Sequence, residues 1–246
     1  TRDAWEEEWR AVFIADSTRF SGHLPVLTSD QAAVTRLYYM GVMTLLYCRR
    51  TPMWGSPATT YVTGFPSSLG TFPHTWVFPW DTMMVSGVLS LLDPRALREM
   101  ILAFIAADMH KGCAIDFNTG QPVGFWYAVN DYALIHMTWQ YLRYTGDLTL
   151  LDEHVRGATV LDHLNDHARY YRRLAGDDGL ADYGTAQNLL ECVSSYTHKV
   201  ASFNAANVWS GRTVAAMLRL AGRDVEADEL EATAAGLSDA VQELYV

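Results

Sequence analysis

Two stretches with a shared pattern decide the fold: YLRYTGDLTLLDEH at residues 141–154 and MLRLAGRDVEADEL at residues 217–230. Each begins with the apolar end of a helix and reaches a glycine, Gly146 or Gly222. Acidic residues follow, which favour the start of a second helix. The pattern therefore predicts helical hairpins, in which two helices are joined by a short turn.

Four such hairpins are expected along the chain. Their helix pairs are predicted at residues 3–16 and 30–49, 85–92 and 95–110, 128–144 and 148–174, and 205–220 and 225–245. The first helix of each pair is apolar on most sides, whereas the second has one charged face. This difference predicts an all-α fold, an α/α barrel with inner and outer helices. An extended solenoid of helix pairs is the alternative, although its helices are usually more evenly amphipathic.

Composition restricts the class of partner. The 246 residues are 50% hydrophobic and 19% charged, with a formal net charge of −10, which argues against disorder and against nucleic acid. No apolar run reaches the length of a membrane span. Three cysteines are too few for a framework of disulfides. The chain starts at Thr1 and stops at Val246 within an expected helix, so we expect a fragment. The absence of a visible signal peptide favours the cytoplasm.

Three segments rich in aromatic and polar residues precede the apolar helices and are expected at one end of the barrel. The first is WVFPWDTMM at residues 76–84, which places Trp76 and Trp80 beside Asp81. Aromatic faces beside a carboxylate suit the apolar faces and hydroxyls of a pyranose. A structural alternative for Asp81 is the N-cap of the following helix.

The second segment is DFNTGQPVGFWYAVNDYALIHMTW at residues 116–139. Its turn and the first turn of its helix supply further candidates for sugar contact, namely Gln121, Trp126, Tyr127, Asn130 and Asp131. The structural alternatives are a capping role for Asn130 and a helix-dipole interaction for Asp131. His136 follows within an apolar helix and is expected to be a core histidine.

The third segment, residues 182–209, holds two carboxylates, Asp182 and Glu191. Donors and acceptors that suit a sugar lie around them, including Tyr183, His198 and Asn204. The apolar neighbours of Glu191 are expected to raise its pKa by desolvation, as a general acid at neutral pH requires. The alternatives are an ion pair for Glu191 with Lys199 or an arginine, and local turn bonding for Asp182.

No metal and no cofactor are expected. His163 and His167 are spaced i, i+4 on a predicted outer helix that also carries His154, Asp162 and Asp166. Because the same helix carries several arginines, we expect these side chains on a solvated face. The sequence contains none of the motifs H-E-x-x-H, G-x-x-x-x-G-K-[ST], G-x-G-x-x-G and G-x-S-x-G.

Taken in order, FPWDTMM, TGQPVGFWYAV, YTGDLTLL and VASFNAANVW resemble segments of the six-hairpin (α/α)6-barrel glycoside hydrolases. The resemblance runs from about Phe78 to the end of the chain and is closest to glycoside hydrolase families 63 and 37, the relatives of processing α-glucosidase, mannosylglycerate hydrolase and trehalase. It implies an incomplete (α/α)6 toroid, with residues 1–246 forming part of one catalytic domain. It also implies inverting hydrolysis of α-linked glucose- or mannose-type sugars, with Glu191 or Asp182 as the acid and a base beyond Val246.

Two other classes of function stay open. A polysaccharide lyase on a similar toroid would use Tyr196 or His198 as its base, and would need basic groups such as Lys199 and Arg212 to neutralise a uronate. A helical-repeat binding module would have no catalysis, and its carboxylates and tryptophans would not converge. The sequence predicts a carbohydrate partner without nucleic acid or membrane and does not predict an oligomeric state.

Overall fold

The structure is a computed structural model that describes residues 1–14, 17, 19–52, 58–63, 75–185 and 197–245. It is mostly helical, as expected for an all-α protein. The α-helices are α1 (Arg2–Phe13), α2 (Ala32–Cys48), α3 (Pro79–Leu92), α4 (Pro94–Ala107), α5 (Val129–Thr145), α6 (Val160–Arg169), α7 (Ala201–Leu220) and α8 (Asp224–Tyr245). Two 3-10 helices, η1 (Leu148–Asp152) and η2 (Tyr170–Arg173), flank α6 and the strands before it.

The strands are short and form small antiparallel sheets. β1 (Arg49–Arg50) pairs with β2 (Thr60–Tyr61), and β6 (His154–Val155) pairs with β7 (Ala158–Thr159). β4 (Ala114–Asp116) lies between β3 (Trp76–Val77) and β5 (Pro122–Val123), with Trp76 opposite Asp116.

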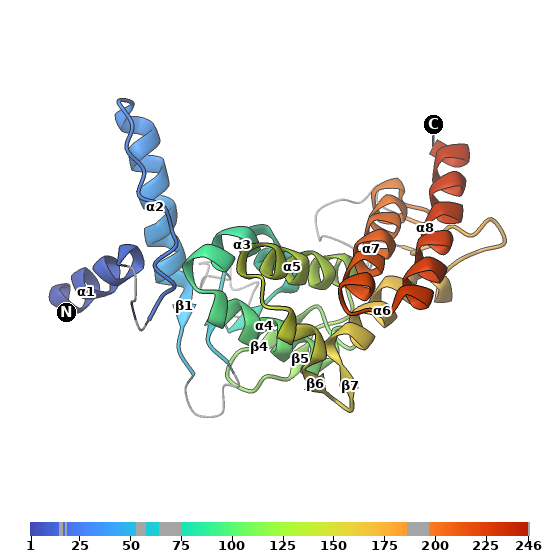
Figure 1. Cartoon of the computed structure of the whole chain (residues 1–246), viewed down its shortest axis with the longest axis horizontal. Helices are drawn as coiled ribbons and strands as arrows, with labels where there is room; N and C mark the ends of the chain where they lie inside the picture. The colour runs from blue at the N-terminus through green and yellow to red at the C-terminus, as the bar shows by residue number, and fades with distance from the viewer. Residues whose placement is uncertain (15–16, 18, 53–57, 64–74, 186–196, 246) are drawn as a thin grey trace.

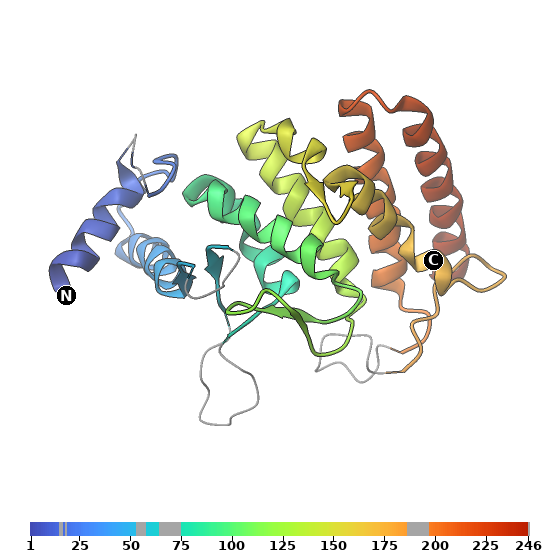
Figure 2. The same cartoon turned by 90° about the horizontal axis from the view of Figure 1, so that it is seen from below.

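Helices α3, α5 and α7 form a row, because α5 packs against both of the others (Figure 1 and Figure 2). α4 packs against α3, α5 and α6, whereas α6 also contacts α5 and α7. α8 packs along the whole of α7. The main core lies between these helices, where Leu97 and Phe104 of α4 and Leu134 of α5 have no exposed surface. Burial of these side chains supplies most of the stability of such a core.

The predicted turns of three hairpins are confirmed. Asp93 caps α4 by accepting the backbone N–H of Ala96, and the following proline starts that helix. Gly146 ends α5 with φ +69°, and Gly222 lies between α7 and α8 with φ +73°. Glycine reaches these angles without the steric cost of a Cβ atom, so both turns follow from the local sequence.

The single helix predicted at residues 148–174 is wrong. η1, the β6–β7 hairpin, α6 and η2 occupy this range instead. Arg156 and Gly157 both have positive φ angles, 53° and 87°, and make the hairpin turn that interrupts the helix. The chain returns to α-helix at a pair of reciprocal hydrogen bonds. The side chain of Thr159 accepts the backbone N–H of Asp162, and the side chain of Asp162 accepts the backbone N–H of Thr159. This capping box satisfies free N–H groups at the start of α6.

α2 has an apolar sequence, yet it leaves several apolar side chains exposed. α2 stands away from the helical row in Figure 1, and Leu37 and Met43 are 75% and 58% exposed. α1 reaches α2 through edge-to-face contacts of Trp9 and Phe13 with Tyr39. Those contacts cover one side of α2, and no described element covers the side with Leu37 and Met43. An apolar composition favours burial, but the partner needed for burial does not lie within the described residues.

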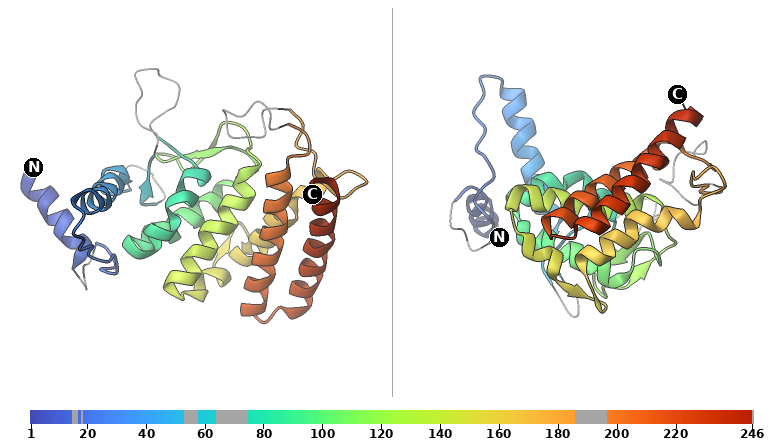
Figure 3. Two further views of the ribbon diagram at one scale, coloured as in Figure 1. Left: turned by 90° about the horizontal axis from the view of Figure 1, so that it is seen from above. Right: turned by 45° about the vertical axis from the view of Figure 1, so that its right-hand side comes forward.

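Helices α3, α5 and α7 begin at the same end of the row, and the β3–β4–β5 sheet lies there too (Figure 3, left). We call this end the helix-start edge. One apolar cluster joins the three helix starts, because Phe78, Val129 and Phe203 belong to or pack against it. The described parts of the segments that the sequence singled out are therefore held together at this edge.

Candidate functional site

The first candidate segment contributes aromatic side chains and one carboxylate to the helix-start edge. Trp76 and Trp80 are partly buried and pack against the cluster that joins the helix starts. Asp81 lies in the first turn of α3, but the N-cap of that helix is Phe78 and has no side-chain capping bond. The carboxylate of Asp81 instead accepts a hydrogen bond of 2.5 Å from the hydroxyl of Thr63. The N-cap alternative is therefore wrong, and Thr63 orients Asp81.

The second segment divides into exposed and buried residues. Gln121 is exposed and Trp126 is partly buried, whereas Tyr127 and Asn130 are buried. The side-chain amide of Asn130 donates to the carbonyl oxygens of Gly112, at 3.0 Å, and Met109, at 3.4 Å. Asn130 thus stabilises the connection between α4 and β4. It does not cap α5, whose N-cap is Ala128.

The third segment places Asp182 and His198 together at the surface. Nδ1 of His198 lies 3.1 Å from Oδ1 of Asp182, which also accepts the backbone N–H of Gly184 at 2.8 Å. The Gly184 N–H and then the His198 ring hold the pKa of Asp182 below its usual value. Turn bonding of Asp182 is confirmed by the Gly184 contact. A lowered pKa favours the carboxylate form at neutral pH, which suits a hydrogen-bond acceptor better than a general acid.

The side chains of Asn204 and Tyr183 are buried beneath the helix-start edge and make hydrogen bonds there. The amide of Asn204 accepts the N–H of Ala181 at 2.9 Å and donates to the carbonyl of the same residue at 3.1 Å. The hydroxyl of Tyr183 accepts from Asn207 at 2.7 Å, and burial raises the pKa of this hydroxyl. Asn204 is fully buried and Tyr183 nearly so, so both position the backbone around Asp182. Glu191, the other acid candidate, lies outside the described residues.

Asp131 belongs to a different group of side chains, which the sequence did not indicate. Its Oδ1 atom lies 2.7 Å from Nε2 of His110 and 2.6 Å from Nδ1 of His167. The two imidazole rings stack at 4.3 Å, and the ring of His110 also stacks on Tyr170 at 3.7 Å. Burial alone would raise the pKa of Asp131, but the bonds from His110 and His167 hold it below its usual value.

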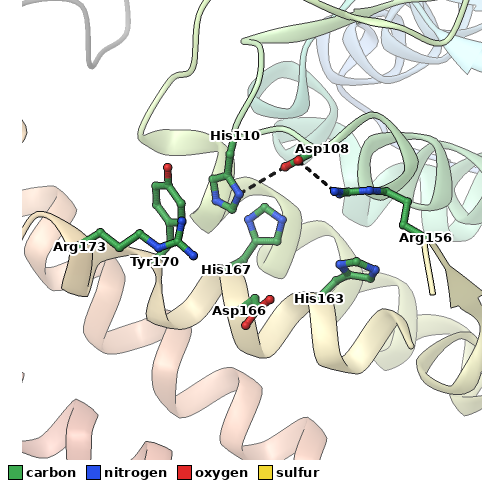
Figure 4. A pocket seen from close by; sticks show the side chains of 8 residues that line it. All are labelled: Asp108, His110, Arg156, His163, Asp166, His167, Tyr170 and Arg173. Atoms are coloured by element: carbon green, nitrogen blue, oxygen red, sulfur yellow. Dashed lines mark hydrogen bonds and ion pairs between the residues drawn. The ribbon is translucent and has the colours of Figure 1, made fainter. Parts of the chain in front are cut away.

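His110 and His167 line a pocket of about 280 Å³, and Figure 4 shows the side chains around it. Its lining comes from the end of α4, the β6–β7 turn, α6 and η2, and consists of Asp108, His110, Arg156, His163, Asp166, His167, Tyr170 and Arg173. Asp108 is ion-paired with Arg156 at 3.0 Å. The group of His110, Asp131 and His167 offers three ligand atoms within 4.8 Å of one another, close enough to hold a metal ion.

The solvated face predicted for His167 is wrong, because this side chain is only 7% exposed and bonds to Asp131. His163 is partly buried and lies 2.7 Å from the carbonyl oxygen of Val155. The i, i+4 spacing of the two histidines was visible in the sequence, but only His167 belongs to the group around Asp131. His110 and Asp131 lie on other elements, and no local pattern connects them with α6.

His136 packs in the core as expected, but not all of its ring nitrogens have a hydrogen-bond partner in the described structure. Its ring packs against Tyr132 and Trp209 inside the helical row, and desolvation lowers its pKa. Its Nδ1 atom is buried without a hydrogen-bond partner in the described structure, while Nε2 lies 3.4 Å from the amide of Gln140. The ring is therefore held mainly by aromatic packing.

A scan of protein-family models and a search of curated proteins found no match to this chain. Among the described helices, none is both long enough and apolar enough to cross a bilayer. The fold defines a mainly helical protein with a row of helices, and Trp76, Trp80 and Trp126 pack against one apolar cluster where those helices begin. Its function is inferred from that geometry.

Proposed function

We propose that this chain is part of an (α/α)6-toroid glycoside hydrolase that acts on α-linked glucose- or mannose-type sugars with inversion. The observation that carries the proposal is the gathering of three separate segments at the helix-start edge. Trp76, Trp80 and Trp126 lie there, with Asp81 and Asp182 on the same side of the helical row.

The arrangement of helices is compatible with part of a toroid. The first helices of three hairpins, α3, α5 and α7, lie side by side. The second helices of these hairpins are α4, α6 and α8. Each hairpin adds one helix to the inner row, so a ring of six would need further hairpins. α3 exposes Met84 and Val88 on its surface, as an inner helix with an uncovered flank would.

The proposed chemistry needs a protonated acid on one side of the sugar and a carboxylate that activates water on the other. Because the N–H of Gly184 bonds to the carboxylate of Asp182 and Nδ1 of His198 lies 3.1 Å from it, which favours the charged form, we assign the acid to Glu191 and sugar binding to Asp182 and His198. The tryptophans would stack on the apolar faces of the pyranose, while Asp81 would accept hydrogen bonds from its hydroxyls. The general base is expected outside residues 1–246.

Sugar binding by the chain itself is the first test. Quenching of tryptophan fluorescence by α-glucosides and α-mannosides should saturate for the wild type and weaken at least tenfold in Trp80→Ala. The matched control is Trp5→Ala, since Trp5 is an exposed tryptophan on α1, away from the helix-start edge. Equal weakening in both variants, or no saturation with any sugar, would contradict the proposal.

Hydrolysis is tested in the full-length protein. Glu191→Gln should abolish release of reducing sugar while sugar binding is retained, whereas Asp182→Asn should mainly weaken binding. Full hydrolysis by both variants would refute the assignment. Polarimetry or NMR of the fresh product would show whether the anomeric centre is inverted.

The lyase alternative receives less support from the described contacts. A lyase must neutralise the carboxylate of a uronate, but Lys199 is ion-paired with Asp178, and Arg212 lies 3.8 Å from Glu231. Tyr196, one of its proposed bases, lies outside the described residues. Ultraviolet absorbance of an unsaturated product would favour the lyase over the hydrolase. A binding module without catalysis would bind sugar and release no product of either kind.

A further inference from the structure

We propose that His110, Asp131 and His167 form a binding site for a divalent transition-metal ion such as Zn²⁺. The three residues come from the loop after α4, the first turn of α5 and the last turn of α6. Two imidazoles and one carboxylate are a donor set that first-row transition metals prefer over Mg²⁺ or Ca²⁺.

The distances require only a small adjustment for an ion to enter. The two nitrogens lie 2.7 Å and 2.6 Å from Oδ1 of Asp131. Bonds of about 2.0–2.1 Å at tetrahedral angles would separate neighbouring donors by about 3.3 Å, so each ring would move by about 0.7 Å. The pocket lined by His110 and His167 gives the ion a route of entry.

Groups around the ligands fit the pattern of a metal site. Nδ1 of His110 lies 3.5 Å from Oδ1 of Asp108. When Nε2 of His110 binds a metal, the ring proton must lie on Nδ1, where this carboxylate can accept it. A carboxylate behind a ligating histidine fixes the orientation of the ring and strengthens the metal bond. Asp108 is itself held in place by Arg156.

The charge balance of the pocket also permits a cation. Arg156 is paired with Asp108, and the guanidinium of Arg173 lies over the ring of Tyr170 at 4.8 Å. Asp131 is buried beneath two imidazoles and carries the charge that faces the proposed ion. His110 and His167 also line the pocket of about 280 Å³, which has room for water molecules that could complete the coordination of the ion.

The site differs from the sugar-binding edge in its residues, although Tyr170 of its pocket makes an edge contact with Trp126 at 5.3 Å. Asp131 lies in the first turn of α5, but its carboxylate bonds to His110 and His167 and not to the tryptophans of the helix-start edge. The ion would join α4, α5 and α6, and metal bonds would replace the present hydrogen bonds. Binding would therefore stabilise the folded chain independently of any sugar.

Cobalt and zinc are the probes, used with metal-free protein. Co²⁺ should give visible d–d absorption bands that saturate at about one equivalent per chain, and Zn²⁺ should remove them by competition. Zn²⁺ at about a hundredfold excess over its dissociation constant should raise Tm by roughly 5–10 °C. Wild-type protein with neither the bands nor a rise in Tm would overturn the proposal, whatever the variants show.

Variants then assign the ligands. Asp131→Asn and His167→Gln should each lose the bands, with the far-UV circular dichroism spectrum checked for retained helix. The matched control is His198→Ala, because His198 and Asp182 form a second histidine–carboxylate pair, at the surface. Loss of the bands in the control, with retention in both site variants, would place the ion elsewhere and refute the assignment.

Discussion

Replacement of Asn204 by alanine should cost the chain a large share of its stability. The wild-type amide makes two hydrogen bonds to the backbone of Ala181: its Oδ1 accepts the N–H at 2.9 Å, and its Nδ2 donates to the carbonyl oxygen at 3.1 Å. Both residues are fully buried. Because a buried polar group left without a partner costs about 1–3 kcal/mol, two such groups should together cost about 2–6 kcal/mol. Total stabilities of folded domains are about 5–15 kcal/mol.

Urea denaturation measures this effect directly. With an m-value of about 3 kcal/mol/M, a loss of about 3 kcal/mol lowers the midpoint by about 1 M. Tryptophan fluorescence and far-UV circular dichroism should be followed together, since coincident transitions are needed for a single free energy of unfolding. The control is Asn118→Ala, an exposed asparagine in the turn between β4 and β5, which should change stability by less than about 0.5 kcal/mol.

The result also separates a structural role for Asn204 from the sugar contact that the sequence predicted. If Asn204 positions the backbone, Asn204→Ala should lower the midpoint equally with and without sugar. If it contacts sugar instead, stability without ligand should match the wild type and only sugar binding should weaken. A midpoint within 0.2 M of the wild type would refute the argument from buried hydrogen bonds.

Two further predictions concern stability. The pKa of Asp162 is lowered chiefly by the hydroxyl of Thr159, so its contribution is present above the unfolded-state pKa of about 3.9 and is lost as pH falls through the lower folded-state pKa. Acid unfolding of Asp162→Asn followed by circular dichroism should therefore show a weaker pH dependence; an unchanged acid transition would contradict this. A Cβ atom at Gly112 would lie 2.6 Å from the carbonyl oxygen of Val123, so Gly112→Ala should destabilise the chain by about 1–3 kcal/mol. Gly236→Ala in α8 meets nothing within 4 Å and should stabilise it by about 0.5–1 kcal/mol, and equal urea midpoints for the two variants would refute the packing argument.

Features set by neighbouring residues could be predicted from the sequence. The turns at Asp93, Gly146 and Gly222 depend on capping and positive φ angles, which act within one helical turn. The range 148–174 shows the limit of periodicity. Its apolar residues are compatible with one long helix, yet the turn at Arg156 and Gly157 divides them between a 3-10 helix, strands and a shorter α-helix.

The candidate site was predictable only as a set of segments. Asp81, Asp182 and the tryptophans were singled out by residue type, and one apolar cluster holds their helix starts together. The sequence could not distinguish exposed from supporting polar residues. Asn130 and Asn204 have the same side chain as a sugar-binding asparagine, but both are fully buried and bond to backbone groups.

The sequence by itself determined a mainly helical chain, the short turns of three hairpins and the presence of aromatic and acidic residues before the apolar helices. These properties follow from spacing and local backbone chemistry. Only the tertiary structure decided that Asp131 meets His110 and His167, and that α2 leaves an apolar face uncovered. Contacts between residues distant in the chain depend on how helices pack, and hydrophobic burial is non-directional, so local patterns do not specify which faces meet.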